Sequence, residues 1–197
     1  PIGAWSTGGS LNTARYGLGN AGTQTAALAF GGEITPVTAV TESYNGSSWT
    51  EVNDMNTARQ SGGSNGTQTS ALYYGGNTPP HTAVTESWNG TNWTEVADLN
   101  TARGALGGTG IVTSALAFGG STGSLTGATE VWNGSSWTEQ GDLSVARKFF
   151  ASAGANSTAA LAAGGGTPVS SSTEEFTGAG VPIGAWATGG NLNTARS

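Results

Sequence analysis

The sequence predicts an all-β fold of four similar units, each built from four antiparallel strands. Three observations predict it. Distinctive residues return every 44 residues, each unit contains four short strand-like segments joined by Gly- and Asn-rich turns, and no segment shows the 3.6-residue apolar spacing of a helical repeat. Four antiparallel strands repeated at about 44 residues indicate the blades of a β-propeller.

The register of the repeat is set by its tryptophans and arginines. Tryptophans at 5, 49, 93, 137 and 186 step by 44, 44, 44 and 49, and arginines at 15, 59, 103, 147 and 196 take the same four steps. Two independent residue types therefore share one register. We expect a single domain over 1–197, with blades at about 12–55, 56–99, 100–143 and 144–192.

Each unit divides into four segments, illustrated here by the first. A Gly-rich segment (YGLGNAG, 16–22) is followed by small apolar residues that end in Gly-Gly (TAALAFGG, 25–32). Two further segments (AVTESYNG, 39–46, and SSWTEVNDM, 47–55) meet at Asn-Gly, which predicts a hairpin with a type I′ turn. We expect the Gly-Gly segments to be paired on both sides and almost no helix to form. Glycines of the first segment, such as Gly19 and Gly63, are expected where inner strands crowd the axis.

Composition and charge exclude several classes of partner. The net charge of −6 comes from 12 acidic and 6 basic residues, and five of the six basic residues are the periodic arginines. No basic patch remains for a phosphate backbone, so we expect no nucleic-acid partner. No apolar run approaches the roughly 20 residues of a membrane helix, so no membrane partner is expected. The absence of cysteine excludes disulfides and thiolate metal sites.

The order of the motifs resembles the kelch repeat over essentially the whole chain. Gly-Gly after an apolar strand is followed by an aromatic residue, then by a tryptophan, and then by an arginine ten residues beyond it; the aromatic residues are Tyr44, Trp88, Trp132 and Phe176. The resemblance implies a four-bladed propeller of kelch type, with the strand after the arginine innermost and the tryptophan strand outermost. The units depart from the family in being shorter than its usual length of about 50 residues and in placing Asn-Gly after the aromatic residue. Such Ser/Thr/Asn-rich arrays also resemble repeats in predicted structural proteins of marine bacteriophages.

The periodic tryptophans and arginines are interpreted as structural. Burial of one tryptophan removes roughly 150–250 Å² from water, so one in each unit is expected to anchor a contact between blades. The arginines allow a ring of ligand-binding cations, but each unit also supplies one glutamate in a Thr-Glu pair, which favours buried ion pairs. The residues assigned to these structural roles are Trp5, Trp49, Trp93, Trp137, Trp186, and the pairs Arg15 with Glu42, Arg59 with Glu86, Arg103 with Glu130, and Arg147 with Glu174.

Residues that would carry catalysis or hold a metal are scarce. His81 is the only histidine and is expected to be a surface loop residue without the further ligands that a metal requires. No nucleophile stands near an orienting base, and no Gly-rich segment has the form of a phosphate loop. We therefore expect no enzyme, no catalytic residues, no metal and no cofactor. The sequence does not assign ligand-binding residues.

The loops between the second and third segments vary most and are expected to emerge on one face. They read EITPVTA (33–39), NTPPHTA (77–83), STGSLTGA (121–128) and GTPVSSS (166–172). We expect a non-catalytic binding or structural scaffold module of a phage virion or tail, in the virion or outside the cell. The alternative is a lectin-like glycan-binding propeller that uses these loops. A protein or a glycan is the expected partner of the loop face, and a monomer is favoured over a dimer that forms an eight-bladed ring.

The two ends of the chain carry nearly the same sequence. PIGAWSTGGSLNTAR at 1–15 and PIGAWATGGNLNTAR at 182–196 agree at 13 of 15 positions. Residues 1–11 therefore form an extra outer-strand segment that duplicates 182–192. We expect one copy to complete the fourth blade and its twin to hang free or to pair with a neighbouring molecule. The sequence does not decide which copy does so, or whether the ring closes within one chain.

Overall fold

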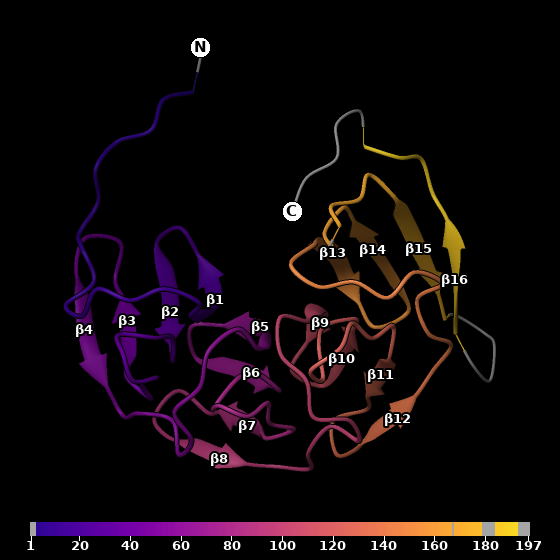
Figure 1. Ribbon diagram of the computed structural model, residues 1–197. Helices are drawn as coiled ribbons and strands as arrows, with labels where there is room; N and C mark the ends of the chain where they lie inside the picture. Colours follow the sequence, from indigo (N-terminus) through magenta and orange to yellow (C-terminus); the bar gives the residue numbers. More distant parts are fainter. Residues whose placement is uncertain (1–2, 167, 179–183, 193–197) are drawn as a thin grey trace.

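The fold is all-β in the residues that the computed structural model describes, which are 3–166, 168–178 and 184–192. Its sixteen strands form four antiparallel sheets, and each sheet contains four strands that are consecutive in the sequence. We call each sheet with its loops a blade. The blades lie side by side along an arc (Figure 1), an arrangement consistent with a β-propeller. The predicted 44-residue unit thus corresponds to one sheet.

The strands follow the repeat closely. The first blade contains β1 (Gly19–Thr23), β2 (Ala26–Phe30), β3 (Thr41–Tyr44) and β4 (Trp49–Val52). The second contains β5 (Gly63–Thr67), β6 (Ser70–Tyr74), β7 (Thr85–Trp88) and β8 (Trp93–Glu95). The third contains β9 (Gly107–Ile111), β10 (Ser114–Phe118), β11 (Thr129–Trp132) and β12 (Trp137–Glu139). The fourth contains β13 (Ala151–Asn156), β14 (Ala159–Ala163), β15 (Thr173–Thr177) and β16 (Ala185–Thr188).

The strands that lead into Gly-Gly are the core of each blade. β2, β6, β10 and β14 are hydrogen-bonded on both sides, which confirms the prediction for these segments. The apolar residues of β6 and β10 are buried throughout, as in the run Ala115–Phe118, because these strands are paired on both edges and have a blade against both faces. In the end blades, β2 and β14 also carry half-buried or exposed alanines. No helix is present in the described part of the chain, as the sequence predicted.

The Asn-Gly turns differ from the predicted type I′ turn. That turn needs positive φ at both central residues, whereas only the glycines have it, with +95° at Gly46, +93° at Gly90 and +97° at Gly134. The side chain of Asn45 instead caps the turn, because its Oδ1 accepts the N–H groups of Ser47 and Ser48, both at 3.0 Å. Asparagine is therefore used for its side-chain acceptor and not for its tolerance of positive φ.

Neighbouring blades meet through aromatic residues of their middle and outer strands. The ring of Trp93 in the second blade lies 4.8 Å from that of Phe30 in the first, and its Nε1 donates to Thr41 Oγ1 at 3.0 Å. The same contact recurs twice along the arc: Trp137 packs on Tyr74 and donates to Thr85, and Trp186 packs on Phe118 and donates to Thr129. Three hydrophobic clusters of similar composition lie at these three junctions.

The inner-strand glycines make room for aromatic rings. A Cβ atom added to Gly63 would lie 2.3 Å from Tyr74 Cε2, and one added to Gly108 would lie 2.2 Å from Tyr74 Oη. Tyr74 thus lies over two neighbouring inner strands, which only glycine permits. Close approach was expected at these positions, and the group that comes nearest to both glycines is the Tyr74 ring of β6.

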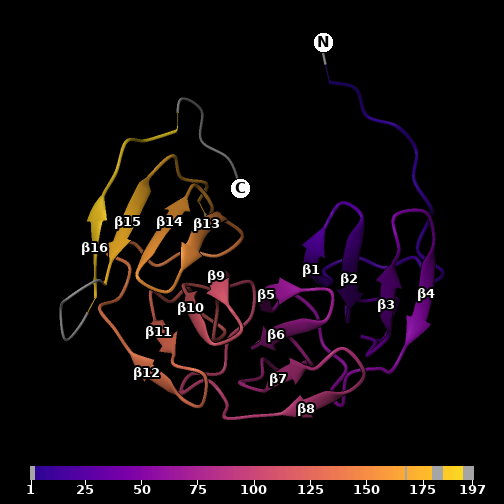
Figure 2. The ribbon, with the colours of Figure 1, turned by 180° about the vertical axis from the view of Figure 1, so that it is seen from behind.

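The two ends of the arc do not meet. The inner strands β1, β5, β9 and β13 pack against one another in that order, but β1 and β13 are apart in both views (Figures 1 and 2). The C-terminal segment completes the fourth blade, since β16 pairs with β15 through Phe176 and Trp186. Residues 3–11 form no strand, and Trp5 is fully exposed. The assignment of Trp5 as a structural anchor is therefore wrong, because its twin Trp186 occupies the edge where it would pack.

Candidate functional site

In every blade a buried ion pair between an arginine and a glutamate, which we call the clasp, fixes the chain just before the inner strand. The guanidinium of Arg59 is fully buried and pairs with Glu86, and it also donates to the carbonyl oxygens of Thr57 at 2.9 Å and Tyr73 at 3.1 Å. The other arginines that the structure describes likewise pair with the glutamate of their own unit: Arg15 with Glu42, Arg103 with Glu130, and Arg147 with Glu174. The four arginines thus lie inside the blades, where no ligand reaches them.

The residues just before each arginine complete the clasp. The second carboxylate oxygen of Glu86 accepts the backbone N–H of Asn56 at 2.7 Å and its side-chain amide at 2.8 Å. Asn12 does the same for Glu42 in the first blade. Burial alone raises the pKa of Glu42, but the hydrogen bonds from Arg15 and Asn12 outweigh it and hold this pKa below its ordinary value. The segment Asn-Thr-Ala-Arg is therefore a fixed anchor.

The second residue after each arginine has left-handed backbone geometry in all four blades. Its φ is +65° at Gly17, +56° at Ser61, +53° at Ala105 and +54° at Phe149. This geometry costs a non-glycine residue about 1 kcal/mol. The reason for it is a backbone relay between blades, because the N–H of Ser61 donates to Gly17 O at 2.7 Å and that of Ala105 to Ser61 O at 2.7 Å. Phe149 continues the relay to Ala105 O at 3.4 Å.

The first residue after each arginine is tied to the variable loop of its own blade. Gln60 pairs with Asn77, and Gly104 pairs with Ser121, through backbone hydrogen bonds of 2.8–3.1 Å. Tyr16 is bridged in the same way to Glu33, and a hydrogen bond to the Glu33 carboxylate raises the pKa of its phenol. The repeated clasp thus brings the loop bases and the inner-strand entrances together near the axis.

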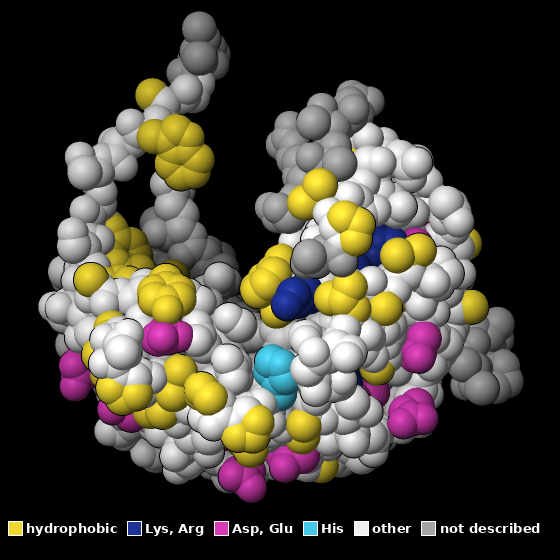
Figure 3. All heavy atoms as spheres, viewed as in Figure 1, with side chains coloured by type: hydrophobic (Ala, Val, Ile, Leu, Met, Phe, Trp, Pro, Cys, Tyr) yellow, Lys and Arg dark blue, Asp and Glu magenta, His cyan; other side chains and the backbone are white. Residues whose placement is uncertain are grey.

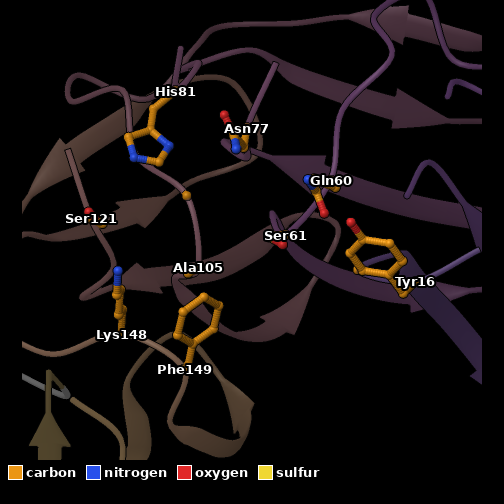
Figure 4. Close-up of a pocket in the computed structure, with 11 residues that line it drawn as sticks. Tyr16, Gln60, Ser61, Asn77, His81, Ala105, Ser121, Lys148 and Phe149 are labelled. Atoms are coloured by element: carbon orange, nitrogen blue, oxygen red, sulfur yellow. The ribbon is translucent and has the colours of Figure 1, made fainter. Parts of the chain in front are cut away.

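A cavity of about 540 Å³ lies at this junction, and we call it the axial pocket. All four blades contribute to it, and their side chains surround one open space (Figure 4). A histidine side chain is visible at the centre of the same face, with a basic side chain nearby (Figure 3). The side chains that line the axial pocket are Tyr16, Gln60, Ser61, Asn77, His81, Ser121, Lys148 and Phe149.

The axial pocket is asymmetric although the scaffold repeats. Directly after Ala-Arg, which all four units share, the chain places Tyr-Gly, Gln-Ser, Gly-Ala and Lys-Phe. The only lysine and the only histidine of the sequence, Lys148 and His81, both line the pocket. Lys148 Nζ lies 5.3 Å from the centre of the Phe149 ring, and Tyr16 and Phe149 are each 62% exposed. The pocket thus offers one ammonium, one imidazole, two exposed rings and several amide and hydroxyl groups.

The sequence-based expectations locate this site only in part. Two of the variable loops lie at the pocket, which Asn77 and His81 reach from the loop of the second blade and Ser121 from that of the third. A second hollow of about 450 Å³ lies between these two loops, beside Pro79, Pro80, Thr122 and Gly123. His81 is a half-buried loop residue that lies against Gly104.

Sequence reasoning passed over Tyr16, Lys148 and Phe149. The signal that identifies them is the divergence of two positions directly after a shared Ala-Arg. Their importance also depends on the relay, which places equivalent residues of different blades side by side.

Neither a metal cluster nor a membrane-spanning helix occurs in the described residues. Within residues 3–166, 168–178 and 184–192, no three His, Asp or Glu side chains are close enough together to hold a metal ion. The same residues include no helix of the length and hydrophobicity that spanning a membrane requires.

The chain matches no protein-family model, and no curated protein sequence is detectably similar to it. The geometry of the site shows a pocket with several kinds of binding group at the centre of a repeated scaffold.

Proposed function

We propose that the protein is a four-bladed propeller of kelch type that acts as a non-catalytic binding or structural module, in a phage virion or tail or otherwise outside the cell. One observation carries the binding role. The units are near copies in their buried clasps, yet each supplies a different pair of residues to the axial pocket. Differences that gather at a concave site on a repeated scaffold are typical of ligand recognition.

The groups in the pocket favour binding over catalysis. Lys148 supplies an ammonium donor and His81 supplies an imidazole. Asn77 and Gln60 supply amides that both donate and accept hydrogen bonds. No described residue of the pocket forms a nucleophile–base hydrogen bond of the kind used in covalent catalysis. The module is accordingly proposed to have no catalytic residues, metal or cofactor.

A glycan is the second candidate ligand, and two observations favour it. Tyr16 and Phe149 present exposed rings at the pocket, and amide and hydroxyl groups lie between them. Such a mixture suits a ligand with apolar ring faces and many hydroxyl groups. The overall charge of −6 argues against nucleic acid. A protein or a glycan at the loop face remains the proposed partner, with no membrane contact.

A glycan array with matched variants tests these alternatives. Specific binding that is lost in Phe149→Ala, and when the 77–81 loop is exchanged, would establish the glycan-binding form. Thr91→Ala is the control, because Thr91 lies in an exposed turn at the outer edge of the second blade. No binding to any glycan by a folded protein favours the structural module. Turnover of any substrate that depends on Lys148 or His81 would contradict both forms of the proposal.

A further inference from the structure

The three junctions between blades are one contact repeated. At each junction the outer-strand tryptophan of the later blade packs on an aromatic residue of the earlier blade and donates to a threonine there. Trp93 is 5% exposed and Trp137 is 6% exposed, whereas Trp186 at the third junction is half-buried. Each blade therefore has two different faces, one that presents the tryptophan and one that receives it.

The first blade has an unpartnered tryptophan face. Tyr44 is half-buried, whereas its equivalents Trp88 and Trp132 are 2% and 3% exposed. Trp49 is also half-buried, whereas its equivalents Trp93 and Trp137 are 5% and 6% exposed. The Nε1 of Trp49 has no acceptor among the residues that the structure describes, although the later tryptophans of the arc all have one. The relay also begins here, since the N–H of Gly17 donates to no described residue.

The fourth blade has an unpartnered receiving face. All six residues of its inner strand β13 are exposed, while β5 and β9, which have neighbours on both sides, are partly buried. Leu161 is half-buried, although its counterparts Leu72 and Leu116 are at most 1% exposed. In the described residues the Thr173 hydroxyl receives no tryptophan N–H, unlike its counterparts.

The free face of the first blade and the free face of the fourth blade correspond to the two sides of the junction that recurs three times within the chain. Three equivalent junctions turn the chain by similar steps, and after three steps β13 is still apart from β1 (Figures 1 and 2). Closure within one chain would require all three packed junctions to change their geometry, which close-packed interfaces resist. A second arc that docks on both free faces would leave the three junctions unchanged.

We propose that a second copy of this chain docks head-to-tail on both free faces and closes a two-fold ring of eight blades. Each copy places Trp49 against Leu161 of its partner and extends the backbone relay from Phe149 to the partner's Gly17. Tyr16, which precedes Gly17, then lies beside the partner's Phe149, so each copy contributes to the axial site of the other. Each of the two contacts joins unlike faces, and the two-fold axis relates one contact to the other, so the ring closes and no filament grows.

The contact between copies is weaker than the junctions within a chain. Ala163 stands where the earlier blades have Phe30, Tyr74 and Phe118, so the receiving face lacks the ring on which the tryptophan packs. Ala163→Phe is expected to supply that ring and to tighten the dimer. Trp49→Asp is expected to break it, because the new carboxylate would be buried in the contact.

Light scattering on the eluting protein measures the assembly directly. We expect twice the chain mass of 19.5 kDa for the unmodified protein, a shift to the monomer for Trp49→Asp, and at least a threefold lower dissociation constant for Ala163→Phe. Ile111→Asp is the control for an added surface charge, since Ile111 is 52% exposed and lies away from both free faces. A monomeric unmodified protein at 100 μM, taken here as roughly a hundred times a micromolar dissociation constant, overturns the proposal.

A disulfide experiment separates the two-copy ring from closure of one chain. Ser64 Oγ lies 3.0 Å from Asn20 O at the first junction, and Ser152 occupies the position of Ser64 in the fourth blade. Because the sequence has no cysteine, Asn20→Cys with Ser152→Cys reports only the new contact. A covalent dimer supports the proposal, whereas an internally linked monomer or no bond overturns it. Asn20→Cys with Ser64→Cys checks the geometry, since that pair must link within one chain.

Discussion

The segments 1–15 and 182–196 place nearly the same sequence in two different structural environments. They agree at 13 of 15 positions, yet Trp186 forms part of β16 and donates to Thr129, while Trp5 is fully exposed. The difference comes from the neighbour, because β15 offers a hydrogen-bonding edge and an aromatic surface to only one of them. Outer-strand structure in this chain is therefore decided by an available edge and not by local propensity.

The N-terminal segment also has a part that does not depend on that edge. Asn12 and Arg15 clasp Glu42 in the first blade, as Asn56 and Arg59 clasp Glu86 in the second. The same short segment thus carries an anchor that needs only its own blade and a strand that needs the preceding blade. A change at either end of the chain can therefore affect the anchor, the outer strand, or both.

Removal of both outer-strand copies should have the largest effect. Deleting 1–11 together with 182–197 leaves β15 as an open edge and exposes Phe118 and Phe176, which pack against Trp186. We expect aggregation, measured by light scattering and by binding of a hydrophobic dye. Deletion of 1–11 alone should leave a folded protein, because Asn12 and Arg15 remain in place. If the single N-terminal deletion also aggregates, residues 3–11 have a role that the structure does not show.

Loss of one interior tryptophan should come next. Trp93→Ala removes a ring that is 5% exposed and packs on Phe30, so we expect a loss of about 3–5 kcal/mol in the free energy of unfolding. Trp49→Ala removes the same residue from a face that is unpartnered within one chain, and its loss should be clearly smaller at protein concentrations where the monomer dominates. Urea unfolding followed by circular dichroism measures both. Equal losses would contradict the distinction between interior and free faces.

The repeat allowed much of this architecture to be predicted from the sequence. Strand order, the paired Gly-Gly strands and the match of each arginine with a glutamate follow from residues that recur in register, because each blade repeats the same local packing. The axial pocket could not be located in this way. Tyr16 and Lys148 lie 132 residues apart, and only the curvature of the arc and the backbone relay bring them to one cavity.

Breaking one clasp tests whether an interior blade depends on its anchor. Arg103→Ala leaves the carboxylate of Glu130 buried without its cation, and removing one partner of a buried pair costs about 3–5 kcal/mol. Adding Glu130→Ala should recover part of that loss, so the double variant should be more stable than the sum of the two single losses predicts. A double-mutant cycle in urea measures the coupling. Additive losses would mean that the two side chains do not stabilise each other.

Acid should test the clasp that the N-terminal segment supplies. Because the pKa of Glu42 is lower in the folded protein than its ordinary value of 4.5, its contribution to stability is complete above about pH 4.5 and is lost as the pH falls through the lowered value. We expect Glu42→Gln to be less stable than the unmodified protein at pH 7 and to lose less stability between pH 5 and pH 3, a window that brackets the ordinary pKa of a glutamate. Urea midpoints across this range measure the difference. Parallel curves for the two proteins would mean that Glu42 does not contribute to the loss of stability in acid.

The smallest effect should come from Trp5. Its side chain is fully exposed and lies in a segment that forms no strand, so Trp5→Ala should change the free energy of unfolding by less than about 0.5 kcal/mol. Trp186→Ala is its matched control, because the same residue in the same local sequence packs on Phe118 and Phe176 and donates a hydrogen bond to Thr129. A large loss for Trp186→Ala beside none for Trp5→Ala shows that the C-terminal copy alone completes the fourth blade in solution. Equal and moderate losses would instead show that the two copies exchange at the edge of β15, each occupying it for part of the time.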